Sequence, residues 1–189
     1  MANVMVMVDF GRTSLDRRRL SYAEVGATRP EAVDWPTAPA GFRRLETTGP
    51  VRGGDRAWPE VTEALLRWAI KTRSGFAVDG SRDAGRVILG GRHWVSAAFG
   101  PVTVTEPVEV VAVVERPDRV GFAYGTLAGH PVSGEEAFIL HRGGAGQVLL
   151  TLRSLTRAAP SGPWRLAFPA LLAAQQVYRR RYARALDRK

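Results

Sequence analysis

Cysteine is absent from this chain of 189 residues, and lysine is nearly absent. Without cysteine there is no disulfide framework, no thiolate nucleophile and no cysteine-ligated zinc finger. No apolar stretch approaches the roughly 20 residues of a membrane-spanning helix. Residues 1–8 also lack the basic start and the long apolar core of a signal peptide. The sequence therefore predicts a cytoplasmic protein without a membrane span.

The two lysines are Lys71 and Lys189, so arginine supplies almost all of the positive charge behind the net +9. Residues 163–189 contain six arginines and one lysine against one aspartate, whereas residues 21–162 are close to neutral. A basic end of this kind fits a partner rich in phosphate, but cations in a last helical turn also complement the helix dipole. Both interpretations stay open for the candidate anion-binding residues Arg179, Arg180, Arg181 and Arg184.

The rest of the composition fits one folded domain, because 45% of the residues are hydrophobic and the chain is long enough to bury a core. We expect residues 21–189 to form this domain. Residues 1–20 are expected to be an N-terminal arm that either adds an edge strand or stays mobile. Residues 22–39 are rich in proline, glycine and alanine, which predicts irregular structure.

Two segments have the spacing of amphipathic helices. The first covers residues 58–72, with Asp55 as its cap and Pro59 in its first turn. The second covers residues 164–186 and has an apolar stripe opposite an arginine-rich face. The stripe consists of Leu171, Ala174, Tyr178, Tyr182 and Ala185.

Most of the remaining sequence alternates with period two, which is typical of half-buried strands in an antiparallel meander. The predicted strands are residues 42–48, 86–90, 93–99, 102–115, 120–127, 135–141 and 148–157. Within residues 102–115 we expect Val108, Val110, Ala112 and Val114 on one face, with Glu109 and Glu115 on the other. A long antiparallel sheet and a final one-faced helix combine most simply when the sheet curls around the helix. The predicted fold class is therefore α+β with a helix-grip arrangement.

Three sequence strings resemble a known family. They are YAEVGAT at residues 22–28, GFAYGTLAGHPVSGEEAF at residues 121–138, and the pair Arg181 and Tyr182. Together they resemble the uncharacterised protein family 0548 over residues 22–186. The resemblance implies one compact cytoplasmic domain and transfers no catalytic residue. The order of the elements adds an analogy with the helix-grip superfamily of START-like and polyketide-cyclase-like proteins.

The segment 121–138 holds the densest group of polar residues. By strand parity Phe122 and Tyr124 point to one side, while the small residues around them face the other and allow a close approach of another segment. In a cavity Phe122 would supply an apolar wall and Tyr124 a hydroxyl that orients a ligand. The alternative is that both fill the core. His130 lies in a glycine and proline turn, where it is either a general base or a histidine bound to the backbone.

Glu135 and Glu136 are consecutive, so on a strand they face opposite sides. Glu136 shares the parity of Phe138 and is the better candidate for the cavity. A carboxylate there would either keep a raised pKa or pair with an arginine such as Arg153. These considerations make Tyr124, His130, Glu136, Phe122, Glu135 and Arg153 the candidate ligand-binding residues.

Metal and cofactor sites are not predicted. A set of His130, one glutamate and His141 has usable ligand types, but strand spacing places His141 about 20 Å from Glu135. Two function classes follow from the sequence. The favoured one is a protein that binds a hydrophobic small molecule between sheet and C-terminal helix, with or without catalysis. The alternative is an interaction module whose arginine-rich helix binds nucleic acid, anionic lipid or an acidic protein.

Overall fold

A computed structural model describes residues 6–7, 15–79, 85–99 and 102–187. Short 3-10 helices lie between or before the longer elements, at Leu15–Arg17, Gly54–Ala57, Gly144–Gly146 and Pro163–Arg165. The strands are β1 Val6–Met7, β2 Arg43–Val51, β3 Phe76–Val78, β4 Arg92–Phe99, β5 Val102–Arg116, β6 Arg119–Thr126, β7 Val132–Arg142 and β8 Val148–Ala158. The helices are α1 Trp58–Leu66, α2 Ala69–Thr72 and α3 Phe168–Ala185.

Seven of these strands form an antiparallel sheet in the order β2-β8-β7-β6-β5-β4-β3. Strands β4 to β8 are neighbours in space as they are in sequence, so the predicted meander is confirmed. Strand β1 pairs with β5 in parallel. Residues 1–5 and 8–14 of the predicted arm lie outside the described residues, so the division into arm and domain stays a prediction.

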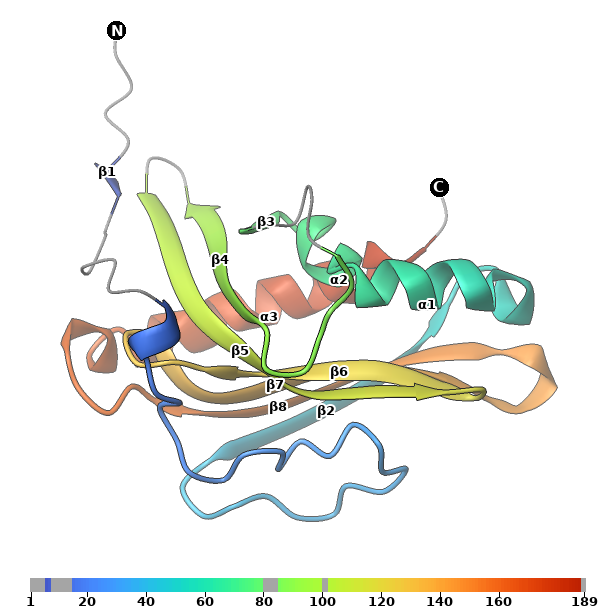
Figure 1. Cartoon of the computed structure of the whole chain (residues 1–189), viewed down its shortest axis with the longest axis horizontal. Coiled ribbons are helices and arrows are strands. Elements are labelled where there is room, and N and C mark those ends of the chain that lie inside the picture. Colours follow the sequence, from blue (N-terminus) through green and yellow to red (C-terminus); the bar gives the residue numbers. More distant parts are fainter. Residues whose placement is uncertain (1–5, 8–14, 80–84, 100–101, 188–189) are drawn as a thin grey trace, which may run out of the picture.

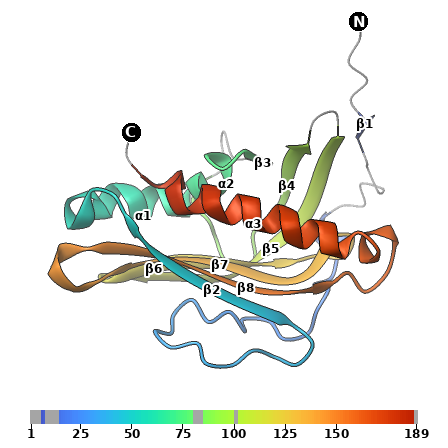
Figure 2. The same ribbon diagram turned by 180° about the vertical axis from the view of Figure 1, so that it is seen from behind.

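The two faces of the sheet are covered differently (Figure 1). The described helices lie on one side, here called the helix face, and residues 21–41 cover the other side, here called the loop face. Strands β4 and β5 rise beside α3, so the sheet curves around that helix (Figures 1 and 2). The main core fills the helix face, with Leu65, Phe122, Phe138 and Tyr182 among its buried members. The α+β helix-grip fold predicted from the sequence is confirmed.

The single helix predicted over residues 58–72 is wrong, because the chain breaks between α1 and α2. Trp68 adopts a left-handed conformation with φ 62° and ψ 14°. A bulky residue in this region is strained. The cause is tertiary: the Trp68 ring is fully buried and packs 5.0 Å from the ring of Phe122. Burial of this large ring therefore outweighs the helical pattern of the local sequence.

Smaller differences also have physical causes. Asp55 does not cap α1, since it lies in a 3-10 turn and its carboxylate pairs with Arg142 at 2.8 Å, although Pro59 does lie in the first turn. Residues 86–90 form a loop rather than a strand. Its amides at Val87 and Gly90 donate to backbone carbonyls of α1 and β5. The second predicted helix begins four residues later than expected, and β3 was not foreseen.

A β-bulge interrupts the alternation of β5 between Val110 and Ala112. Val108 and Val110 lie in the main core, as predicted. Beyond the bulge the faces exchange, so Ala112 packs with the small cluster of the loop face and Val113 packs against the main core. The expectations for Ala112, Val114 and Glu115 are therefore wrong, because the extra residue of a bulge inverts the parity that follows it.

Candidate functional site

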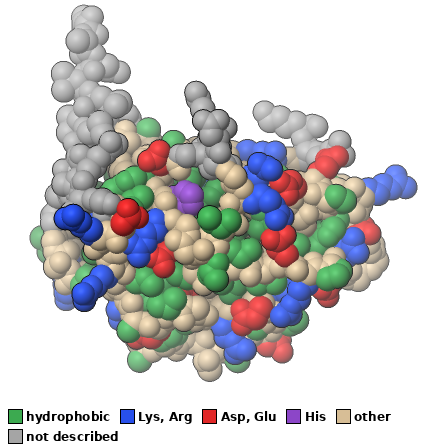
Figure 3. All heavy atoms as spheres, viewed as in Figure 1, with side chains coloured by type: hydrophobic (Ala, Val, Ile, Leu, Met, Phe, Trp, Pro, Cys, Tyr) green, Lys and Arg blue, Asp and Glu red, His purple; other side chains and the backbone are tan. Residues whose placement is uncertain are grey.

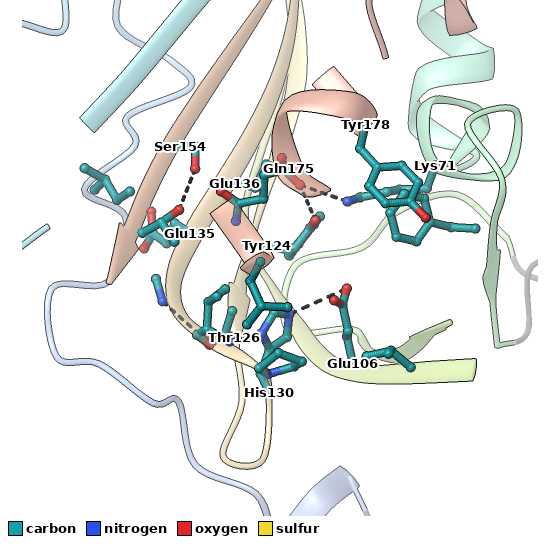
Figure 4. Close-up of a pocket in the computed structure, with 18 of the residues that line it drawn as sticks. Lys71, Glu106, Tyr124, Thr126, His130, Glu135, Glu136, Ser154, Gln175 and Tyr178 are labelled. Atoms are coloured by element: carbon teal, nitrogen blue, oxygen red, sulfur yellow. Dashed lines mark hydrogen bonds and ion pairs between the residues drawn. The ribbon is translucent and has the colours of Figure 1, made fainter. Parts of the chain in front are cut away.

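A pocket of about 100 Å³ lies between the helix face of the sheet and α3 (Figure 4). Phe76, Val104 and Leu171 contribute to its apolar wall. The polar wall includes residues of α2, the sheet, the turn after β6 and α3, among them Lys71, Glu106, Tyr124, His130, Glu136, Gln175, Tyr178 and Tyr182. The structure therefore brings four of the predicted candidates, Tyr124, His130, Glu135 and Glu136, to the wall of one pocket.

An ion pair between Lys71 and Glu136 forms the centre of the polar wall. Lys71 Nζ donates to Glu136 Oε2 at 2.8 Å and to the hydroxyl oxygen of Tyr182 at 2.6 Å. The Tyr124 hydroxyl donates to the same Glu136 oxygen. The Lys71 side chain is 2% exposed and that of Glu136 is 22% exposed. The ammonium is therefore sealed in the protein, while the carboxylate keeps one side open toward the pocket.

Aromatic rings surround the Lys71 ammonium. Its Nζ lies 4.6 Å from the ring centre of Phe76, 4.7 Å from Tyr182, 4.9 Å from Tyr124 and 5.4 Å from Phe138. The negative faces of such rings attract a cation, most strongly where water is excluded. One anion and four rings thus offset the large cost of burying this charge.

Sequence reasoning missed Lys71, although a signal was present. The residue falls three positions after Trp68, on the apolar stripe of the predicted helix, where a cation is unusual. The left-handed Trp68 ends one helical segment and begins the next, and Lys71 belongs to the short helix that follows. The strained residue thereby directs the lysine toward the sheet.

Glu106 and His130 form a second polar group at the pocket. Glu106 Oε2 lies 3.8 Å from His130 Nε2, and the two side chains are 22% and 6% exposed. Burial raises the pKa of Glu106 to about 7, with Lys71 opposing and Glu136 reinforcing the shift. Burial also lowers the pKa of His130 to about 3, and the Lys71 charge adds to this effect. Near neutral pH the imidazole is therefore uncharged and Glu106 is partly protonated.

The other ring nitrogen of His130 contacts the backbone. Nδ1 lies 3.1 Å from the Val132 amide nitrogen and 3.0 Å from the Val132 carbonyl oxygen. If Nδ1 accepts from the amide, the proton of the neutral ring is on Nε2 and points toward Glu106. The low pKa makes His130 a weak base, so the general-base role considered from the sequence is not supported, and the backbone-bound alternative fits the geometry.

Sequence reasoning also missed Glu106, which shares strand parity with Val104, Val108 and Val110. A carboxylate on the otherwise apolar face of a strand was the available signal. Phe122, in contrast, fills the core as the alternative interpretation proposed. Its ring packs 5.5 Å from that of Phe138, and it is fully buried without lining the pocket.

Burial raises the pKa of Tyr124 and of Tyr182 well above the ordinary value for a phenol, and the neighbouring Glu136 charge adds to the shift. Both hydroxyls therefore keep their protons. They act as hydrogen-bonding groups that hold Glu136 and Lys71 in place.

Glu135 borders the pocket, but its carboxylate is held by the loop that covers the other face. Its two oxygens accept hydrogen bonds from the Tyr22 hydroxyl, the Gly26 amide, and both the amide and the hydroxyl of Thr28. A Cβ at Gly125 would collide with the Tyr22 hydroxyl. The predicted opposition of the two glutamates and the close approach to the small face of β6 are both seen in the structure.

Arg153 also belongs to the loop face, so the expected ion pair between Arg153 and a pocket carboxylate is wrong. Its guanidinium pairs with Glu46 at 2.8 Å and donates to the backbone carbonyls of Arg29 and Val33 at 2.7 and 2.8 Å. The physical reason is parity: Arg153 is paired with Ala137, whose side chain lies on the loop face. Lys71 takes the place that the sequence interpretation gave to an arginine.

The C-terminal arginines do not form a uniform basic surface. Arg179 is half-buried and donates to Gln175, while Arg181 donates to the Ser74 carbonyl and lies 5.3 Å from the ring centre of Tyr178. Arg180 and Arg184 are exposed. Figure 3 shows the side of the molecule away from α3, and basic and acidic side chains are mixed there.

The set of His130, a glutamate and His141 is not brought together. His141 lies on the loop-face side, where its Nε2 is 3.0 Å from the Thr151 hydroxyl. Among the described residues there is no cluster of three or more ligand-type side chains arranged to hold a metal ion.

Comparison with known proteins identifies the family. A family model described as a domain of unknown function, DUF1990, matches residues 21–185. The chain belongs to this family. A relative, the UPF0548 protein of Deinococcus radiodurans, is 36% identical over 179 residues, which cover 89% of this chain and 86% of the relative. The family resemblance predicted from the sequence is confirmed.

Solved structures show the same fold as this DUF1990 protein at low sequence identity. A hypothetical protein from Helicobacter pylori has a TM-score of 0.56 and 14% identity, and the match covers 80% of this chain and 94% of that one. An aromatase/cyclase from Streptomyces has a TM-score of 0.51 and 16% identity, with coverage of 75% and 91%. Similarity at this level shows a shared fold, and it does not bear on activity.

Proposed function

We propose that this DUF1990 protein binds a hydrophobic small molecule in the pocket between the sheet and α3. The observation that carries the proposal is the composition of that pocket. Most of the surface that lines the pocket is apolar, and polar groups of α2, α3, the sheet and the turn after β6 converge on the space. This combination is characteristic of small-molecule sites.

The volume limits the size of the bound group. The pocket of about 100 Å³ is smaller than an engineered apolar cavity of about 150 Å³ that accommodates benzene, so it holds a group no larger than one small ring. A larger ligand would place one end in the pocket and leave the rest outside. The proposal is for binding, because His130 is a weak base and Glu136 is already engaged by Lys71 and Tyr124.

The interaction-module alternative is not favoured. Base stacking on the basic helix would need Tyr178 and Tyr182 to face outward. Tyr182 is instead buried, and both rings pack against Phe76. No helix among the described residues has the length and apolar character needed to cross a bilayer. The cytoplasmic location stays a prediction, which fractionation of cells expressing the protein would test.

Native mass spectrometry of the purified protein tests the proposal with a matched pair of variants on α3. Leu171→Trp fills the pocket, whereas Val177→Trp adds the same ring at an exposed position. We expect a small molecule to co-purify with the wild type and with Val177→Trp, and to be lost from Leu171→Trp. Equal retention by both variants would show that the compound binds elsewhere.

A further inference from the structure

The charges that face the pocket are unevenly compensated. Lys71 and Glu136 neutralise each other at 2.8 Å, so this part of the wall has no net charge to offer a ligand. Glu106 has a different environment. Among the residues that the structure describes, its ion-pair contact is His130 at 3.8 Å, and burial keeps that imidazole uncharged.

A carboxyl group that faces an apolar space without a cation holds its proton more readily than one in water. In that form Glu106 is a hydrogen-bond donor, while an ionised carboxylate only accepts. The ionisable groups that surround it come from several elements, namely Lys71 of α2, Tyr124 of β6, His130 of the following turn, Glu136 of β7, and Tyr178 and Tyr182 of α3. Lys71 is the cation of this set, and its charge opposes the rise in the Glu106 pKa, but its ammonium is paired with Glu136 rather than with Glu106.

The charged groups in the pocket wall also distinguish between cationic, anionic and uncharged ligands. A cationic ligand would be repelled by the Lys71 ammonium in the pocket wall, and the Glu136 carboxylate is already paired with that lysine. An anionic ligand would meet Glu136 and whatever fraction of Glu106 is ionised. An uncharged ligand with an acceptor oxygen meets neither repulsion, and the Glu106 hydroxyl, together with an Nε2 proton of His130, can donate to that oxygen.

We propose that the Glu106–His130 end of the pocket recognises the carbonyl oxygen of an uncharged, ring-sized ligand, with Glu106 donating the hydrogen bond as a carboxylic acid. This inference rests on the proposed function and specifies the ligand class for the same pocket. Glu106 acts here as a specificity-determining residue, and no bond is made or broken.

Four probes of matched size test the inference: acetophenone, ethylbenzene, benzoate and benzylamine. They differ in the head group only, as an uncharged acceptor, an apolar group, an anion and a cation. Binding is measured by ligand-observed NMR titration at pH 5.5 with the full chain. We expect acetophenone to bind about tenfold more tightly than ethylbenzene, the effect of one net hydrogen bond. Both ions should bind more weakly than acetophenone.

The pH dependence gives a second readout that needs no variant. Raising the pH from 5.5 to 8.5 should weaken acetophenone binding toward the level of ethylbenzene, because Glu106 loses its proton with a pKa of about 7. Binding of ethylbenzene should change little. The Glu106→Gln variant retains an N–H donor that does not titrate, so its affinity for acetophenone should be independent of pH. Glu115→Gln, at the exposed end of the same strand, should behave like the wild type.

The outcomes separate the two proposals. Equal binding of acetophenone and ethylbenzene, or tightest binding of benzoate or benzylamine, would overturn the ligand class while leaving a binding pocket in place. Acetophenone binding that is independent of pH in the wild type would overturn the role of Glu106. Failure of all four probes to bind would overturn both the inference and the proposed function on which it rests.

Discussion

The two faces of the sheet use buried charge in different ways, and the neighbours Glu135 and Glu136 show the difference. On the loop face, Glu135 accepts four hydrogen bonds from one loop, and Arg153 donates hydrogen bonds to backbone carbonyls of the same loop. On the helix face, Glu136 shares one oxygen between Lys71 and Tyr124 and keeps contact with a pocket. The first arrangement fixes chain geometry, whereas the second leaves polar groups available to a ligand.

The largest effect is expected on the loop face. Glu135→Gln replaces one carboxylate oxygen by an NH₂ group, which cannot accept the hydrogen bonds that the loop donates to that oxygen. We therefore expect the free energy of unfolding to fall by about 4 kcal/mol. Chemical denaturation measures this change. Glu31→Gln is the matched control, since the side chain of that residue is 44% exposed, pairs with Arg29 at 3.5 Å and should contribute less than about 1 kcal/mol. If Glu135→Gln lowers the free energy of unfolding no more than the control does, the hydrogen bonds to Glu135 do not hold the loop on the sheet.

On the helix face we expect a somewhat smaller effect from the buried ion pair. Lys71→Met leaves Glu136 without its cation and should lower the free energy of unfolding by about 3 kcal/mol. The double variant Lys71→Met with Glu136→Met removes both charges and should be more stable than Lys71→Met alone. A double-mutant cycle by urea unfolding measures the coupling. Strictly additive losses would show that the two side chains do not depend on each other.

The smallest of the three effects concerns Glu106 and pH. Between pH 4.5 and about 7 the folded state keeps a proton on Glu106 that the unfolded state releases. This contribution to stability is therefore complete below pH 4.5 and is lost as the pH rises through 7. His130 opposes it, since its pKa falls from 6.5 to about 3 on folding, so stability from this group falls as the pH drops below 6.5.

The variant Glu106→Gln isolates the first contribution, because His130 is common to both proteins. Relative to Glu106→Gln, the wild type should lose about 2 kcal/mol of unfolding free energy between pH 5 and 7. Urea unfolding across this range gives the difference curve. A flat curve would mean that Glu106 is solvated like an ordinary surface carboxyl.

Local geometry explains what could be predicted from the sequence. The placement of Glu135 and Glu136 on opposite sides follows from the period of a strand, and short turns imply a meander. The partner of each buried charge could not be predicted in this way. Lys71 is 65 residues from Glu136 in sequence, and it arrives there because the buried Trp68 breaks a helix that local propensity favours. The exchange of faces beyond Val110 likewise depends on one bulge.

The position of a bound probe tests the central claim most directly. Methyl NMR spectra recorded during titration with acetophenone at pH 5.5 would report on pocket residues such as Val104, Val132, Leu155 and Leu171. We predict that these signals shift, while those of the exposed Val33 and Ile88 stay in place. Shifts confined to residues outside the pocket would contradict the assignment of the helix face as the ligand-binding side of the protein.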